Sequence, residues 1–364
     1  MKAGRRSAVV GAAAALAGAM PALARGAFRT EIVVRTVNNL RAPADVEALV
    51  AHAAQHGVGT INLAVKQDED DEIASGLVFY ASALAPRAPG YQAFDALAGT
   101  IRAAHARGLK VRAWVPQFHD QMAIRAHPAW QMQAFDGRRG VAYTGRDRRE
   151  LFVNPVDPAA RDYQRLLIEE IVRRYEVDGI VLDWLRFDDY NMDLGGETRT
   201  KFRAAAGFDP AGIDFSSDNL QRRQWNAWRS AVIADHVRRL RAGIDGVRAG
   251  VELGAYILPP EFLEVAQDAA QFSRWLDFLS PMAYYRDWGF EPRWVDRELV
   301  PQTVTRAGSA AVIPVLDEDW SDAAARTVLP EIRRTYPAIT TLSWFAYGKW
   351  TPAAMQRIAR LSRL

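Results

Sequence analysis

Asp183 interrupts an otherwise apolar run of residues that has the length of a buried strand. Side chains alternate along a strand, so Asp183 and Val181 should share one face and Leu182 should occupy the other. An acid at the end of such a strand is partly withdrawn from water, which raises its pKa unless a cation such as Arg186 or Arg35 compensates. A carboxyl with a raised pKa is suited to general acid catalysis. The run therefore predicts a catalytic role for Asp183, the alternative being an ion pair that only joins loops at a rim.

Hydrolysis of a glycosidic bond needs a second carboxylate, because one group protonates the leaving oxygen while another acts as base or nucleophile. Candidates follow the ends of strand-like runs, namely Asp188 after the run of Asp183 and the acidic triplet at residues 317–319, which includes Glu318. We expect Glu318 or Asp188 to be the catalytic partner of Asp183, and we expect Arg186 to adjust the pKa of Asp183. Acidic triplets in loops are commonly solvated surface, which is the competing interpretation of the triplet.

Aromatic side chains crowd the ends of the same strand-like runs. Flat rings with polar edges make good platforms for sugars, since they combine apolar area with hydrogen bonding. About half of these rings should instead fill the core, as large aromatic residues usually do. The rings that we expect to line a groove are Trp114, Tyr284, Tyr285 and Trp344. His119 follows the third strand-like run and is a further candidate for contact with substrate.

The chain contains no Cys, which excludes disulfides, zinc–thiolate sites, iron–sulfur clusters and thiol catalysis. His52 and His56 have a helical spacing that can bind zinc, but no third ligand and no H-E-x-x-H motif accompany them. Sequence motifs of serine hydrolases, phosphate-binding loops and dinucleotide sites are also missing. We therefore expect chemistry that uses no cofactor and no metal ion.

The residues with possible chemistry lie on a recurring pattern of an apolar run, a loop, an amphipathic helix and a Gly. The runs read as strands that are apolar on both faces, which is typical of a parallel sheet covered by helices. Eight such units in a chain of 364 residues favour a single α/β domain, a (β/α)8 barrel of the TIM type, over an open sheet. The expected strands cover residues 31–37, 60–65, 110–115, 180–184, 251–258, 278–285, 311–316 and 339–345.

Three long connections follow strands and precede helices, at residues 67–92, 118–155 and 187–219. In a (β/α)8 barrel such loops lie at the carboxyl ends of the strands, where active sites are built. They predict the walls of a cleft at that face of one catalytic domain over residues 28–364.

The first 24 residues are typical of an export signal. Arg5 and Arg6 precede a small apolar stretch, and A-L-A at residues 22–24 fits the cleavage rule. The paired arginines partly match the twin-arginine route. This segment holds three cations and no acid while the whole chain has a formal charge of +3, so its removal leaves a neutral chain and argues against nucleic-acid binding. We expect a monomer in the periplasm or outside the cell that is not inserted in a membrane.

Four short motifs occur together in the chain: N-P at residues 154–155 followed by A-R-D-Y at 160–163, H-P-A-W at 127–130, D-G-I-V-L-D-W-L-R-F at 178–187, and F-L-S-P-M-A-Y-Y at 278–285. In combination they resemble the exported family 10-like glycosyl hydrolases of bacteria. The resemblance implies a (β/α)8 barrel that acts on a polysaccharide, with Asp183 as the catalytic acid and Asn154 in the substrate site.

The barrel is also similar to that of the periplasmic enzyme that hydrolyses poly-β-1,6-N-acetylglucosamine. Chitinase-type barrels carry D-G-x-D-x-D-x-E at the same strand, but Val181 and Leu185 stand here at the second Asp and the Glu, so that mechanism does not transfer. We expect an exported glycoside hydrolase that cleaves a bacterial or environmental polysaccharide. The competing hypothesis is a carbohydrate-binding barrel without catalysis that serves exopolysaccharide export or modification. A second carboxylate about 5–10 Å from Asp183 across an open groove would favour the enzyme.

Overall fold

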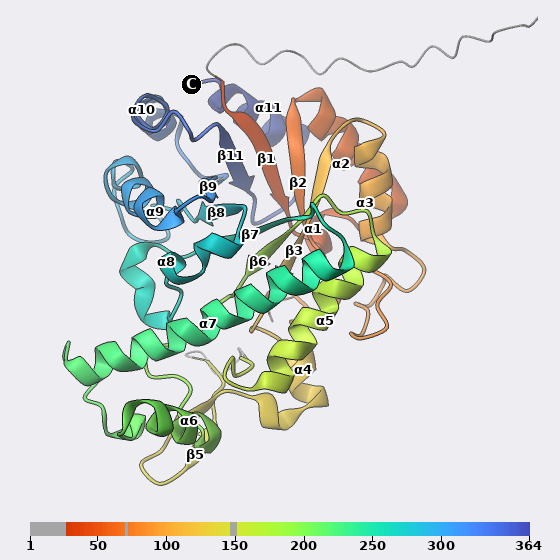
Figure 1. Cartoon of the computed structure of the whole chain (residues 1–364). Helices are drawn as coiled ribbons and strands as arrows, with labels where there is room; N and C mark the ends of the chain where they lie inside the picture. Colours follow the sequence, from red (N-terminus) through yellow and green to blue (C-terminus); the bar gives the residue numbers. More distant parts are fainter. Residues whose placement is uncertain (1–26, 70–71, 146–150) are drawn as a thin grey trace, which may run out of the picture.

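The computed structural model describes residues 27–69, 72–145 and 151–364, so the expected export signal lies outside the described residues. Parallel strands form one curled sheet in the order β10-β11-β1-β2-β3-β6-β7-β8-β9 (Figure 1). The strands are β1 (Arg29–Val34), β2 (Val58–Ala64), β3 (Lys110–Pro116), β6 (Gly179–Asp183), β7 (Glu252–Ile257), β8 (Phe278–Pro281), β9 (Ala311–Val312), β10 (Val315–Asp317) and β11 (Thr341–Phe345).

The two edges of this sheet are parts of one stretch of chain, because β9 and β10 are separated only by Ile313 and Pro314. The backbone N–H of Ile313 donates to Leu279 on β8 (2.8 Å), and that of Ala283 donates to Val315 on β10 (2.7 Å). Pro314 has no N–H to donate, which accounts for the break in the strand. The sheet is therefore closed. Because β9 and β10 together form the seventh barrel strand, the barrel has eight strands, and the expected (β/α)8 barrel is confirmed.

A helical layer surrounds the barrel, with at least one helix after each of the eight barrel strands (Figure 1). Asp157 caps the start of helix α5 (Pro158–Arg174) after β3, since its side chain accepts hydrogen bonds from the N–H groups of Ala159 and Ala160. The helices of this layer are α1 (Thr36–Asn39), α2 (Pro43–Gln55), α3 (Ala96–His105), α5 (Pro158–Arg174), α7 (Leu220–Val247), α8 (Ala269–Phe272), α9 (Val300–Ala307), α10 (Asp322–Thr335) and α11 (Pro352–Leu361).

The long connections hold small elements that the hydrophobic pattern did not resolve. They are α4 (Gln121–Ala126), the hairpin of β4 (Gln133–Phe135) and β5 (Gly140–Ala142), α6 (Gly196–Ala206) and the short 3-10 segments Pro128–Trp130, Pro210–Gly212 and Pro260–Val265. The strand expected at 278–285 ends at Pro281, since the residues after it bend into a turn closed by the N–H of Phe290 on the oxygen of Tyr285 (2.7 Å).

Side-chain alternation separates the barrel interior from the layer beneath the helices. Val181 packs in the interior with Trp114 and Phe345, whereas Leu182 and Trp344 pack outward against the helices. The same alternation carries a polar cluster at the amino ends of the strands, where Arg112 donates to Glu31 (2.7 Å) and Glu252 (2.7 Å) inside the barrel.

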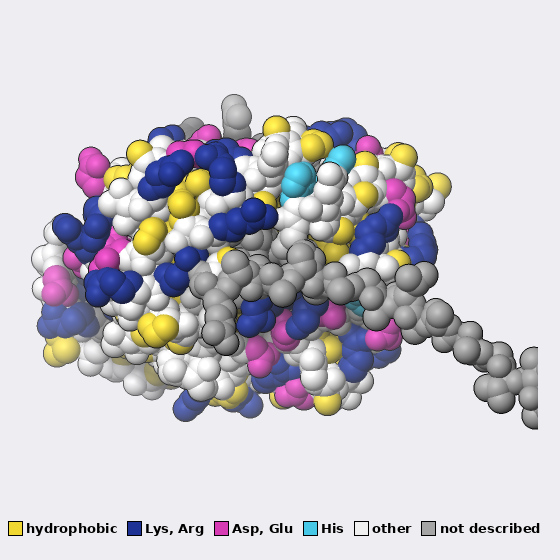
Figure 2. All heavy atoms as spheres, turned by 90° about the horizontal axis from the view of Figure 1, so that it is seen from above, with side chains coloured by type: hydrophobic (Ala, Val, Ile, Leu, Met, Phe, Trp, Pro, Cys, Tyr) yellow, Lys and Arg dark blue, Asp and Glu magenta, His cyan; other side chains and the backbone are white. Residues whose placement is uncertain are grey.

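Two observations concern the surface of the described residues. None of their helices combines the length and the apolar character needed to cross a membrane. Seen from the end of the barrel at which β1 begins, basic side chains are scattered among acidic ones (Figure 2).

Candidate active site

A cavity of about 220 Å³ opens at the carboxyl ends of the barrel strands. Its walls come from both halves of the chain. Every barrel strand except the seventh, which consists of β9 and β10, contributes a residue of the strand or of the loop that follows it. The lining residues are Val33, Asp68, Glu69, Trp114, Asp183, Trp184, Arg186, Tyr256, Leu258, Met282, Tyr284, Asp287, Trp288, Phe345 and Tyr347.

Asp183 ends β6 and points into this cavity, as strand alternation predicted. Its Oδ2 accepts a hydrogen bond from the indole Nε1 of Trp114 (2.9 Å), and its Oδ1 accepts one from the backbone N–H of Trp184 (2.7 Å). Trp184 adopts a left-handed backbone (φ 49°), which is uncommon outside glycine.

Burial raises the pKa of Asp183 to about 7, and the nearby charge of Asp68 pushes it in the same direction. The two hydrogen bonds and the charge of Arg186 oppose this rise without cancelling it. Near neutral pH the carboxyl therefore exists in both forms, which is the condition for donating a proton and taking it back.

Asp68 is a second carboxylate in the same cavity, and sequence reasoning did not single it out. It follows β2 by four residues and is almost fully buried, where Arg35 at the end of β1 donates to it at 3.2 Å. Arg35 also lies 3.6 Å from Glu69, so this cation serves the loop after β2 and not Asp183 as first considered. The signal available in the sequence was an acid just past the end of a strand, the same signal that selected Asp188 and the triplet at residues 317–319.

Three further residues expected at the site do line the cavity. Trp114 holds Asp183, and the guanidinium of Arg186 lies 4.5 Å from the centre of the Trp184 ring. Tyr284 stacks on Phe345 with ring centres 5.8 Å apart, and burial raises the pKa of Tyr284 well above its ordinary value.

The two expected partners of Asp183 are not among the lining residues. Asp188 accepts hydrogen bonds from the hydroxyl of Tyr143 and from Arg186, so it braces the loop behind the cavity. Glu318 follows β10, and its backbone oxygen accepts a hydrogen bond from Arg357 of the outer helix α11 (2.9 Å). The acids that line the cavity together with Asp183 are Asp68, Glu69 and Asp287.

His119 and Asn154 lie in the wall of loops and not on the cavity surface. His119 is fully buried and stacks on Phe152, with ring centres 4.9 Å apart and an angle of 8° between the rings. The side chain of Asn154 donates to Asp193 (2.9 Å) and Thr198 (3.0 Å), which joins the loop after β3 to the loop after β6.

Tyr285 and Trp344 are also absent from the lining, and strand alternation explains Trp344. Trp344 points outward from β11 and donates to Ser362 on the outer layer (3.1 Å), while its neighbour Phe345 points into the cavity. Tyr285 packs edge to face on Trp320, with ring centres 5.2 Å apart, while its neighbour Tyr284 faces the cavity. Adjacent side chains on a strand point to opposite faces, so only one of Trp344 and Phe345 can face the inside.

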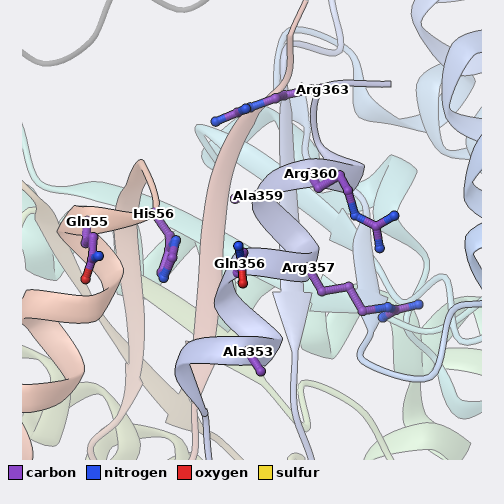
Figure 3. A pocket seen from close by; sticks show the side chains of 8 residues that line it. All are labelled: Gln55, His56, Ala353, Gln356, Arg357, Ala359, Arg360 and Arg363. Carbon is purple, nitrogen blue, oxygen red and sulfur yellow. The ribbon is translucent and has the colours of Figure 1, made fainter.

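A second hollow, of about 480 Å³, opens at the amino-terminal end of the barrel between the end of α2 and α11 (Figure 3). Its polar lining consists of Gln55, His56, Gln356, Arg357, Arg360 and Arg363. No carboxylate belongs to the described residues that line it, so this hollow offers no acid pair for hydrolysis. Elsewhere in the described parts of the chain, no group of three or more acidic or His side chains is arranged to hold a metal ion.

A (β/α)8 barrel with a protonatable carboxyl in an aromatic cavity at the carboxyl ends of its strands has the architecture of a glycoside hydrolase. Residues 33–330 match the family described as Glycosyl hydrolase-like 10, and the chain belongs to this family. Membership confirms the expected family and, with it, the expected class of enzyme, a glycoside hydrolase.

Two curated relatives share parts of the sequence. Glycosyl hydrolase DigH of Escherichia coli (strain K12) is 21% identical over 294 residues, which cover 76% of this chain and 61% of DigH. The S-layer-related protein of Niallia circulans is 31% identical over 122 residues, or 29% of this chain and 8% of that protein. The chain thus spans less than two thirds of either relative.

Solved structures share the fold at low sequence identity. The glycoside hydrolase domain of PgaB (BpsB) from Bordetella bronchiseptica superposes with a TM-score of 0.71 at 16% identity, covering 93% of this chain and 98% of that domain. The β-galactosidase of Halorubrum lacusprofundi superposes with a TM-score of 0.66 at 12% identity, covering 92% of this chain and 57% of that enzyme.

Proposed function

We propose that the protein hydrolyses a polysaccharide with Asp183 as the general acid and Asp68 as the second carboxylate. The observation that carries this proposal is the pair itself: a carboxyl with a pKa of about 7 and a carboxylate held by Arg35 line one cavity. Two acids in unlike environments divide the roles of proton donor and charged partner.

In the proposed reaction Asp183 gives its proton to the oxygen that bridges two sugars, and the bond from that oxygen to the anomeric carbon breaks. Positive charge develops on the departing sugar ring, and the carboxylate of Asp68, which is paired with Arg35, stabilises it. A water molecule then adds to the anomeric carbon, and its proton passes to a carboxylate. The aromatic walls reduce the access of bulk water and strengthen these charge interactions.

The substrate class and location belong to the same proposal. Seven of the lining residues are aromatic, a composition suited to the flat faces of sugar rings. Export to the periplasm or the cell exterior, by the twin-arginine route, rests on the signal-like composition and the paired arginines of the first 24 residues. Both are consistent with a family of glycosyl hydrolase-like proteins.

Asp183→Asn tests the catalytic assignment, because the amide keeps the shape of the carboxyl but cannot donate the same proton. We expect release of reducing sugar from a polysaccharide panel to fall by about 10²–10⁴-fold, the usual contribution of a general acid. Asp319→Asn is the matched control, since Asp319 is an exposed acid after β10 and outside the cavity lining.

Three outcomes are distinguishable in this experiment. Loss of activity in Asp183→Asn with full activity in Asp319→Asn supports the mechanism. Wild-type activity in Asp183→Asn overturns the assignment. A wild-type protein that binds a polysaccharide but releases no reducing sugar from any of them identifies the carbohydrate-binding alternative.

A further inference from the structure

Exposed aromatic side chains gather at the mouth of the Asp183 cavity. The large apolar residues that are well exposed in the described chain include four aliphatic ones, Leu84, Leu166, Leu220 and Val304, and two aromatic ones, Phe262 and Tyr347. Tyr347 lines the cavity, and Phe262 packs on Trp288, which also lines it. Scattered aliphatic residues are normal on a surface, but exposed rings grouped at one cavity mark a ligand-binding groove.

Phe262 and Trp288 form a fixed pair of rings on the loops after β7 and β8. Their ring centres are 5.1 Å apart, and the indole Nε1 of Trp288 donates to the backbone oxygen of Met282 (3.2 Å). Glu261, next to Phe262, accepts a hydrogen bond from Trp294 (2.9 Å), which anchors this loop to the helical segment after β8. The pair is therefore held in place before any ligand arrives, which lowers the entropy cost of binding.

Tyr347 extends the aromatic rim to the loop after β11. Its ring packs edge to face on Phe345, with ring centres 4.8 Å apart, and its hydroxyl donates to Asp287. Asp287 immediately precedes Trp288 in the chain, so it is next to Trp288 and hydrogen-bonded to Tyr347. Its carboxylate can accept hydrogen bonds from sugar hydroxyls. The two acids of the proposed reaction come instead from the loop after β2 and from the end of β6.

The size of the cavity requires binding outside it. Pockets that enclose a whole drug-sized ligand have volumes of roughly 300–1,000 Å³, and this cavity measures about 220 Å³. It therefore encloses little more than one sugar ring. A longer glycan with its reacting bond at Asp183 must continue over the rim, and the aromatic side of the rim is continuous with the cavity through Trp288.

We propose that Phe262 and Trp288 form a sugar subsite on the rim, which binds a unit of a glycan chain next to the sugar enclosed at Asp183. The inference rests on the proposed function for the position of the reacting bond. It specifies the substrate as an extended chain and not as a small glycoside, and it makes Phe262 a residue for binding without a part in proton transfer.

The test uses the full chain carrying Asp183→Asn, so that polysaccharide is bound but not consumed. Its electrophoretic mobility is measured in gels that contain glycol chitosan, hydroxyethyl cellulose, xylan or dextran. We expect retardation in at least one gel, and we expect Phe262→Ala added to this background to weaken the affinity about tenfold, as for loss of one ring contact. Leu166→Ala is the matched control, because Leu166 is an exposed apolar residue on the outer helix α5.

Retardation that Phe262→Ala removes and Leu166→Ala preserves supports the subsite. Equal retardation of the Phe262→Ala and Leu166→Ala proteins overturns it, and so does the absence of retardation in all four gels. Circular dichroism of each variant identifies a misfolded protein, in which case Phe262→Leu, which keeps an apolar side chain but removes the flat ring, replaces Phe262→Ala. If the subsite is supported while the wild type releases no reducing sugar, the proposed hydrolysis fails and the binding inference stands.

Discussion

The two ends of the barrel interior shift the pKa of their carboxylates in opposite directions. At the amino end, Arg112 reaches both Glu31 and Glu252, and Lys110 adds a second cation to Glu252 (2.8 Å). Burial alone would raise the pKa of Glu252, but Arg112 and Lys110 together lower it below its ordinary value. At the carboxyl end, Asp183 has two neutral donors and its pKa rises to about 7.

This difference separates an acid that stabilises the fold from an acid available for chemistry. A carboxylate paired with a guanidinium keeps its charge and gives no proton near neutral pH. Hydrogen bonds from an indole and a backbone amide orient a carboxyl but compensate its burial only in part. Position on the barrel axis is thus insufficient to identify a catalytic acid, since both ends place carboxylates there.

Breaking the amino-terminal cluster should give the largest loss of stability. Arg112→Leu leaves two carboxylates inside the barrel without their main cation, and we expect the free energy of unfolding to fall by about 3–5 kcal/mol. Urea unfolding followed by circular dichroism measures this change. Lys110→Ala removes a cation whose side chain is 53% exposed and should cost less than about 1 kcal/mol. Equal effects of the two substitutions would show that Arg112 is not the cation that compensates these acids.

At the carboxyl end, Trp114→Phe should make Asp183 still harder to ionise. The substitution keeps a ring but removes the hydrogen bond to the charged form, so the pKa of Asp183 rises further. Hydrogen bonds to charged groups contribute about 1.5–3 kcal/mol. The loss of one such bond corresponds to a rise in the pKa of Asp183 of about one unit or more. The alkaline limb of the plot of kcat/KM against pH should move to higher pH by that amount.

Trp344→Phe is the control for this measurement, because it removes a hydrogen bond to Ser362 outside the cavity. Its pH profile should keep the wild-type limb. A limb that stays in place in Trp114→Phe would mean that the hydrogen bond from Trp114 does not set the ionisation of Asp183.

A further expected effect is a pH dependence of stability that belongs to Asp183. Its pKa is about 7 in the folded chain and 3.8 as the ordinary value, so the folded state binds the proton more tightly. The resulting stabilisation is present at low pH and is lost as pH rises from about 4 to 7. Asp183→Asn has no such group, so the difference in Tm between the variant and the wild type should grow across this range. A constant difference would contradict a raised pKa in the folded protein.

The periodicity of the chain was enough to predict the barrel and the inward position of one acid, Asp183. Eight apolar runs separated by helices leave few arrangements in which every run is covered on both faces. Within one run, the two-residue repeat of a strand placed Asp183 and Val181 inside and Leu182 outside, as the structure shows. These inferences depend on local geometry, which the sequence carries directly.

Residues beyond the strand ends were harder to place, because a loop has no repeat that fixes the direction of its side chains. Asp188 and Glu318 looked equivalent to Asp68 in sequence, yet only Asp68 lines the cavity. The pairing of Asp68 with Arg35 joins loops after different strands and has no signature in either segment. The prediction for Trp344 was wrong by one residue along β11, and the prediction for Tyr285 assumed a strand that in fact ends at Pro281.

The sequence by itself determined the closed barrel, the face that carries the site and the inward position of Asp183, since each follows from hydrophobic periodicity and chain order. Tertiary structure decided which second acid shares the cavity, which ring of each aromatic pair faces it, and whether a buried carboxylate has a cation beside it. The reason is that ionisation depends on groups within a few ångströms in space, and these groups are brought together from distant parts of the chain only by folding.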